Sequence, residues 1–151
     1  QTTTANPFFS AYQTPFGVPP FDKIKPEHFE PAFEEGMNRQ MAEIAALVRR
    51  RDVPTFQNTI EAFERSGDLF ERVSIVFSNL NGANTNDELQ AIARTLAPKL
   101  AKHGDDIRLN PLLFQRVRMV YDQRDKLNLT TEQKTLLEKM YKSFVRAGAA
   151  L

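Results

Sequence analysis

The chain has two histidines and no cysteine, so few of its residues have metal-binding or nucleophilic chemistry. His28 lies close to Glu27, Glu30 and Glu34, and imidazole and carboxylate groups are potential metal ligands. Carboxylates at the start of a helix are equally explained by their favourable interaction with the helix dipole. We therefore interpret His28 as part of a solvated helix start.

The second histidine, His103, is followed by Gly104, Asp105 and Asp106, a composition typical of a charged surface turn. Neither histidine is followed by Glu and then by a second His four positions later. That spacing would place two imidazoles on one helix face towards a zinc ion. We therefore expect no catalytic, cofactor-binding or metal-binding residue within these 151 positions.

The other motifs of enzyme chemistry are also missing from the sequence. It contains no Gly-x-Ser-x-Gly nucleophile motif and no glycine-rich phosphate loop. The absence of cysteine excludes disulfides and thiolate metal sites. With 20 basic and 19 acidic residues, the charge indicates neither nucleic acid nor an anionic membrane as a partner. No apolar run approaches the ~18 residues of a membrane span.

Residues 1–25 are expected to form an extended arm. Four prolines exclude a continuous helix, namely Pro7, Pro15, Pro19 and Pro20. Five aromatic residues are too many for a solvated tail, namely Phe8, Phe9, Tyr12, Phe16 and Phe21. We expect these rings to pack on the helices that follow. The alternative is that the arm docks on another chain, or on a part of the protein outside these residues.

Residues 26–151 are expected to form a helical domain, because apolar residues recur every three or four positions and period-2 alternation is essentially missing. About five helices are predicted, joined by short loops in an antiparallel assembly. The first begins near Pro26 and ends near Arg49–Arg51, where basic residues suit the negative helix end. The second begins at the N-cap Thr55 and continues to Leu80, with Gly67 on its apolar stripe as a place for a bend or a close helix contact.

The remaining three helices are indicated by their start signals. Thr85 and Glu88 have the spacing of a capping box, and Pro98 is expected to kink the helix that follows them. Asn110 precedes a proline at the first helical position, and Thr130 precedes Gln133 by three residues. The predicted fold class is therefore all-α.

Several ordered stretches of the sequence carry a specific resemblance. They are NPF at 6–8, PFGVPPFDKIKPEHFEPAF at 15–33, PTFQNTIEAFERSG at 54–67, VFSNLNGANTNDELQ at 76–90 and FVRAGA at 144–149. The series resembles the N-terminal region of bacterial peptidyl-dipeptidases (dipeptidyl carboxypeptidases), which belong to the thimet oligopeptidase family of zinc metallopeptidases. The resemblance extends from about residue 6 to the end of the chain.

This resemblance implies a longer, almost wholly helical parent enzyme whose two halves enclose a channel. Such enzymes release dipeptides from the C-terminus of short peptides. Their zinc is held by a His-Glu-x-x-His helix and a further Glu, and the motif Glu acts as general base on the zinc-bound water. None of those residues occurs here, so the resemblance implies a channel wall whose partners are short peptides and the catalytic half of the same protein.

Two other hypotheses stay open at this point. The chain could be a non-catalytic helical adaptor or peptide-binding module, or a metal-dependent enzyme that uses His28. The Gln1 start indicates either a processed chain or a fragment, and the apolar end at Ala147–Leu151 is interpreted as a place where a larger protein was cut. The sequence does not decide between a periplasmic or exported and a cytoplasmic location, nor does it indicate the dipeptide preference or the oligomeric state.

Overall fold

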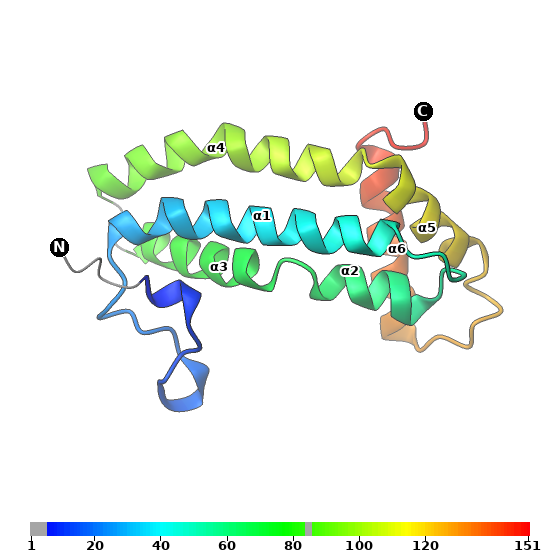
Figure 1. Cartoon of the computed structure of the whole chain (residues 1–151), viewed down its shortest axis with the longest axis horizontal. Helices are drawn as coiled ribbons and strands as arrows, with labels where there is room; N and C mark the ends of the chain where they lie inside the picture. Colours follow the sequence, from blue (N-terminus) through cyan, green and yellow to red (C-terminus); the bar gives the residue numbers. More distant parts are fainter. Residues whose placement is uncertain (1–5, 84–85) are drawn as a thin grey trace. The chain divides into compact units, whose positions relative to one another are not determined.

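A computed structural model describes residues 6–83 and 86–151 of the chain (Figure 1). The described residues contain six α-helices and no β-strand, which confirms the predicted all-α class. They divide into two compact units, each made of two stretches of the chain. The first contains residues up to 40 together with 67–100, and the second contains 41–66 together with 101–151. The single helical domain expected over 26–151 stays a prediction, and each unit is described by itself.

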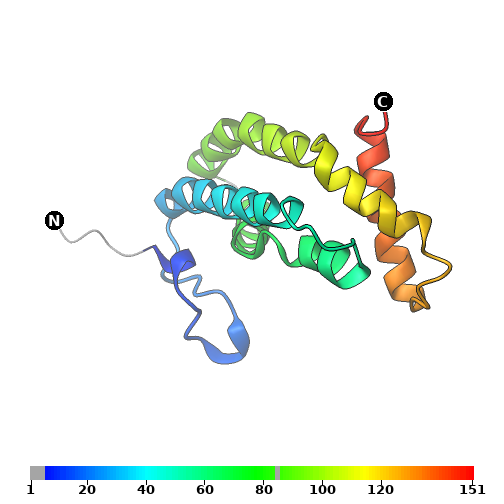
Figure 2. The ribbon, with the colours of Figure 1, turned by 45° about the vertical axis from the view of Figure 1, so that its right-hand side comes forward.

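The first unit begins with the arm, in which three short 3₁₀ turns interrupt an extended chain. These turns are η1 (Pro7–Phe9), η2 (Pro15–Gly17) and η3 (Pro26–His28). Its helices are the first part of α1 (Phe29–Val48), α3 (Asp68–Ala83) and the first part of α4 (Asp87–Arg108). In this unit α3 runs opposite to α1 and to α4 (Figures 1 and 2).

Phenylalanine rings form the core of the first unit. Phe29 and Phe33 on α1 meet Phe77 of α3 in edge-to-face contacts, with ring centroids 5.0 and 5.7 Å apart. The arm contributes Phe8, which is fully buried and lies 5.6 Å from the Phe29 ring. The other arm phenylalanines, Phe9, Phe16 and Phe21, are exposed.

The second predicted helix is broken in the middle. Ser66 is extended and Gly67 has a left-handed φ of +75°, so α2 (Ala62–Arg65) ends there and α3 begins at Asp68. A residue with a side chain is strained at that φ, which glycine adopts readily. The break accounts for six α-helices in the described residues where about five were predicted.

The second unit contains the end of α1, the π-helical turn η4 (Phe56–Glu61), α2, the end of α4, α5 (Pro111–Asp122) and α6 (Thr131–Arg146). The helices α5 and α6 lie side by side and run in opposite directions (Figures 1 and 2). Their facing residues form a second apolar core around Val117, Leu137 and Phe144, each at most 1% exposed.

Most predicted helix starts are confirmed by their capping hydrogen bonds. Thr55 Oγ1 accepts from the Asn58 N–H at 3.0 Å, and Thr130 Oγ1 accepts from the Gln133 N–H at 3.2 Å. Asn110 Oδ1 accepts from the N–H groups of Leu112 and Leu113. The predicted capping box of Thr85 and Glu88 involves a residue, Thr85, that lies outside the described residues. The cap observed for α4 is Asn86, whose Oδ1 accepts from the Leu89 N–H at 2.8 Å.

The helix α4 continues through Pro98 without an interruption. The kink predicted at this proline stays a prediction. Among the helices of residues 6–83 and 86–151, none has the length and apolar character needed to cross a membrane.

Candidate functional site

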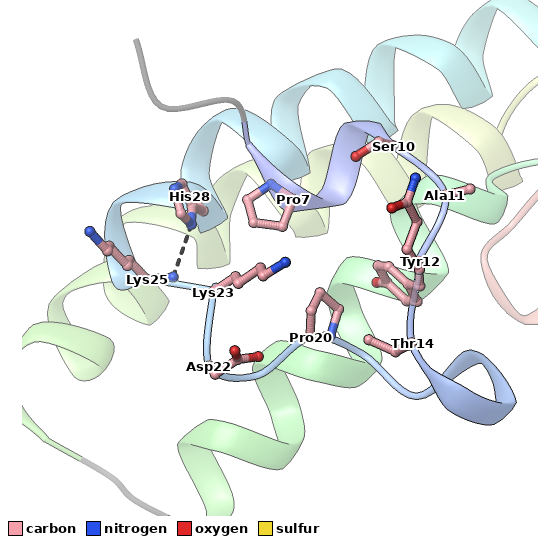
Figure 3. A pocket seen from close by; sticks show the side chains of 11 residues that line it. Pro7, Ser10, Ala11, Tyr12, Thr14, Pro20, Asp22, Lys23, Lys25 and His28 are labelled. Atoms are coloured by element: carbon pink, nitrogen blue, oxygen red, sulfur yellow. Dashed lines mark hydrogen bonds between the residues drawn. The ribbon is translucent and has the colours of Figure 1, made fainter. Parts of the chain in front are cut away.

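His28 is a buried helix-capping residue. It lies in η3 with only 8% of its surface exposed, which corrects the expectation of a solvated position. Its Nδ1 accepts a hydrogen bond from the Lys25 N–H at 2.9 Å (Figure 3). This bond satisfies a main-chain donor ahead of α1, a role usually played by a Glu or Gln side chain. The imidazole therefore directs one of its two nitrogens at the main chain.

His103 is also buried, with 7% of its surface exposed. It lies inside α4, and residues 102–106 are helical, so the predicted surface turn is wrong. The sequence pattern was misleading because Gly104 adopts an ordinary helical conformation here. Burial lowers the pKa of His103, while the nearby Asp106 carboxylate acts in the opposite direction.

The described side chains do not form a set of ligands for a zinc ion. Zinc in proteins takes three or four ligands from Cys, His, Asp and Glu. In the part of the chain that the structure describes, no three such side chains come together to hold a metal ion. The described residues do not fit a zinc site, and we derive no catalytic step through a metal from them.

Three serine hydroxyls are engaged with the main chain, namely Ser74 in α3, Ser143 in α6 and Ser66 directly after α2. Ser74 donates to the Phe70 carbonyl and Ser143 to the Met140 carbonyl, both at 2.8 Å, and Ser66 donates to the Phe63 carbonyl at 2.5 Å. A hydroxyl bonded one turn back along its own helix is not held by a general base. These serines therefore have local structural roles.

A hollow of the first unit lies in the arm. It has a volume of about 530 Å³ and is lined by main-chain turns of residues 7–25 and by His28 (Figure 3). Its lining includes the cations Lys23 and Lys25 and the carboxylate of Asp22. A mixed polar lining of this kind can bind polar ligands or water. It contains no nucleophile held by a base.

Tyr12, on the wall of this hollow, is paired with a cation. The Arg72 guanidinium of α3 lies 5.4 Å from the centroid of the Tyr12 ring, within the range of a cation–π contact. Burial raises the pKa of the Tyr12 hydroxyl, and the charge of Arg72 opposes this effect. The pair attaches the middle of the arm to α3.

In the second unit, Arg116 of α5 is a buried cation that is 7% exposed. Its Nη1 donates to the carbonyls of Arg50 and Asp52, both at 3.3 Å, and its Nη2 donates to Asn58 Oδ1 at 3.2 Å. The Asp52 carboxylate is bound instead by Arg50 at 2.6 Å, and hydrogen bonds from Arg50 lower its pKa to about 2. Arg116 thus holds the loop after α1 against α5.

Sequence reasoning missed Arg116 and the pair of Tyr12 and Arg72. In the sequence, Arg116 cannot be distinguished from the nearby Arg118, which is exposed in the structure. The acceptors of Arg116 lie 58 to 66 residues away in the chain. The one available signal was the register of Arg116, which falls between the buried positions Leu113 and Val120 of α5. The contacts given for Arg116, Tyr12 and Arg72 are those of packing and loop-positioning residues.

The proteins that this chain resembles are peptidases, which agrees with the predicted resemblance. No family model matches the chain. It is 44% identical over 149 residues to the dipeptidyl carboxypeptidase of Escherichia coli (strain K12), a match that covers 99% of this chain and 22% of that protein. It is 41% identical over 148 residues to the dipeptidyl carboxypeptidase of Salmonella typhimurium, covering 98% of this chain and 22% of that protein.

A more distant similarity connects the chain to a second kind of peptidase. It is 26% identical over 138 residues to oligopeptidase A of Escherichia coli, covering 91% of this chain and 20% of that protein. The resemblance to dipeptidyl carboxypeptidases is therefore confirmed over almost the whole chain. The chain spans about a fifth of the length of these relatives.

Proposed function

We propose that this chain is the N-terminal, non-catalytic helical region of a zinc peptidase that releases dipeptides from the C-terminus of short peptides. In this proposal the 151 residues form part of the wall of the substrate channel. The zinc ligands and the general base belong to the remaining four fifths of the protein.

The similarity to dipeptidyl carboxypeptidases carries this proposal, because 44% identity extends over 149 residues without being confined to one motif. The ordered series of motifs supports the N-terminal placement, since it resembles the opening of bacterial peptidyl-dipeptidases. The described residues are consistent with a wall role. Two of their buried polar side chains, His28 and Arg116, bind main-chain atoms.

A channel wall contributes to peptide hydrolysis without supplying a nucleophile. Helices that enclose the substrate exclude folded proteins and bulk water, and they restrict the orientation of a short peptide. For this role the two apolar cores must be rigid, and the loops must be held in place. The Arg116 contacts with the loop after α1 are one such restraint.

The test is product analysis with the full-length protein. A peptide of about nine residues with a free C-terminus is incubated with the enzyme, and the products are identified by mass spectrometry in order of appearance. We expect successive loss of dipeptides from the C-terminal end. A zinc chelator should stop the reaction, and added zinc should restore it.

A peptide with the same sequence and an additional residue at its N-terminus serves as the control. Release from the C-terminal end yields the same first dipeptide from both peptides. Loss of single residues, loss of dipeptides from the N-terminal end, or activity that is insensitive to chelation would contradict the proposed function. Peptide binding by the 151-residue chain that survives chelation, without any hydrolysis by the full-length protein, would favour the adaptor hypothesis.

A further inference from the structure

The arm differs from the rest of the chain in its charge. Residues 1–21 contain no Asp, Glu, Lys, Arg or His, whereas 26% of the whole chain is charged. A solvated loop normally carries charges, and depletion of charged residues is a mark of the core of a protein interface. The composition of the arm is thus that of a segment covered by protein.

The described part of the arm nevertheless exposes most of its large apolar side chains. Phe9 is 44% exposed, Val18 is 48% exposed and Phe21 is 41% exposed, while Phe16 is wholly exposed at 102%. Among the described residues of the first unit, only one other large apolar side chain, Ile75, is exposed to a similar degree. The exposed apolar surface of this unit is therefore concentrated in the arm.

Phe16 is held in an unusual main-chain conformation. Its φ and ψ of 59° and 21° lie in the left-handed region, and the following Gly17 also has a positive φ of 67°. A bulky residue rarely adopts this strained conformation. It persists where contacts with the surrounding structure compensate for the strain. Hydrogen bonds within the loop support this backbone, but the Phe16 ring itself has no covering neighbour among the described residues.

The loop that carries Phe16 projects from the unit. In both views η2 lies at the end of a loop that extends away from α1 and α3 (Figures 1 and 2). Hydrogen bonds across the loop hold its shape, because the Gly17 and Val18 N–H groups donate to the Thr14 and Pro15 carbonyls and the Thr14 hydroxyl donates to the Val18 carbonyl. The loop is a shaped projection with an aromatic ring at its end.

We propose that the projecting loop of residues 14–18, with Phe16 at its end, inserts into an apolar pocket of the polypeptide that follows Leu151 in the full-length protein. This inference rests on the proposed function, in which these residues are about a fifth of a longer chain. The relatives place roughly four fifths of their length outside the matched region, so a large covering surface is available in the same molecule. A partner within the same chain also binds at high effective concentration.

Hydroxyl-radical footprinting of the full-length protein tests the proposal. The oxidation of each ring is measured by tandem mass spectrometry in the folded protein and again in urea. Phe8 is the internal reference for a buried ring, since it is 0% exposed in the first unit. We expect oxidation of Phe16 to drop several-fold on folding, in the manner of Phe8. Oxidation of Phe16 at the same rate in the folded protein and in urea would overturn the proposal.

Dilution separates the intended partner from a second copy of the protein. Protection that is independent of protein concentration supports docking within one chain, because only an intermolecular contact is lost on dilution. Protection that disappears on dilution assigns the loop to a contact between copies and overturns the proposal. Dipeptide release is assayed on the same samples. Protection without dipeptide release contradicts the proposed function alone, and release with an exposed Phe16 contradicts the docking alone.

The variant Phe16→Asn gives an independent test, because the two hypotheses predict different changes in the midpoint of thermal unfolding. Asn adopts the left-handed conformation more readily than Phe but has no ring to bury. If the loop is docked, the midpoint of thermal unfolding of the full-length protein falls. If the loop is free, relief of strain leaves the midpoint unchanged or raises it, which overturns the proposal. Gln13→Asn, at the exposed residue directly before the loop, is the control and should leave the midpoint unchanged.

Discussion

At the scale of single residues, two buried polar side chains, those of His28 and Arg116, are bound to the main chain. Arg116 satisfies two main-chain carbonyls beyond the end of α1, and His28 accepts from the main chain before its start. Carbonyl groups without a partner in a buried setting cost free energy comparable to a lost hydrogen bond. Substitution of these side chains should therefore affect stability more than chemistry.

Replacement of Arg116 by Met is the first prediction. Met keeps the apolar stem but leaves the carbonyls of Arg50 and Asp52 without their donor. We expect the free energy of unfolding to fall by about 2 kcal/mol, measured by urea denaturation. The matched control is Arg118→Met, since Arg118 is exposed on the same helix and its nearest carboxylate is 3.9 Å away. Equal effects of the two variants would contradict the role assigned to Arg116.

The buried His103 gives a prediction about pH. Burial lowers its folded pKa below the ordinary value of 6.5, so between the two pKa values the unfolded chain binds more protons than the folded one. Stability should thus fall as the pH decreases below about 6.5. Urea denaturation at a series of pH values between about 7.5 and 5.5 should show this slope, and His103→Gln should reduce it. An unchanged slope in the variant would contradict the assignment.

At the scale of elements, the helix starts were predictable because their signals are local. Thr55, Asn110 and Thr130 each cap a main-chain N–H two or three residues away, so the sequence near each start contains both partners. The break before α3 was not predictable in the same way. Gly67 is read equally well as a helix contact or as a helix end. In the structure Gly67 has a left-handed φ of +75° and lies beside the Gln40 side chain, which is distant in the sequence.

A pair of glycine substitutions tests the contact between α1 and α3. A Cβ on Gly36 would lie 2.8 Å from the Phe70 Cα, whereas a Cβ on Gly82 meets nothing within 4 Å. Both glycines are helical, Gly36 in the interior of α1 and Gly82 in the last turn of α3, so alanine raises the helix propensity at each. We expect Gly82→Ala to raise the free energy of unfolding by about 0.5–1 kcal/mol, and Gly36→Ala to lower it by about 1–3 kcal/mol.

Urea denaturation of the two glycine variants beside the parent protein is the measurement. The informative result is that the two substitutions change the free energy of unfolding in opposite directions. Opposite changes distinguish a steric clash between α1 and α3 from the general effect of alanine in a helix. Stabilisation by both substitutions would show that the backbone of α3 does not approach α1 as closely as described.

At the scale of the whole molecule, the all-α fold class and the resemblance to peptidases were predictable from the sequence. The long-range side-chain contacts were not. Apolar periodicity determines the helices, and the ordered motifs carried the resemblance that the 44% identity confirms. The contacts of Arg116 with the loop after α1 and of Tyr12 with Arg72 connect residues about 60 positions apart, and one sequence contains no signal for such pairs. The division into two compact units also depends on long-range packing.

The central proposal is that these residues belong to a peptidase and do not perform its chemistry. Its most direct test is dipeptide release from one short peptide, measured in parallel for the full-length protein and for the 151-residue chain, after circular dichroism has established that the chain is helical. We expect release of the C-terminal dipeptide by the full-length protein and no hydrolysis by the 151-residue chain. Release by the 151-residue chain, or no release by the full-length protein, would contradict the claim.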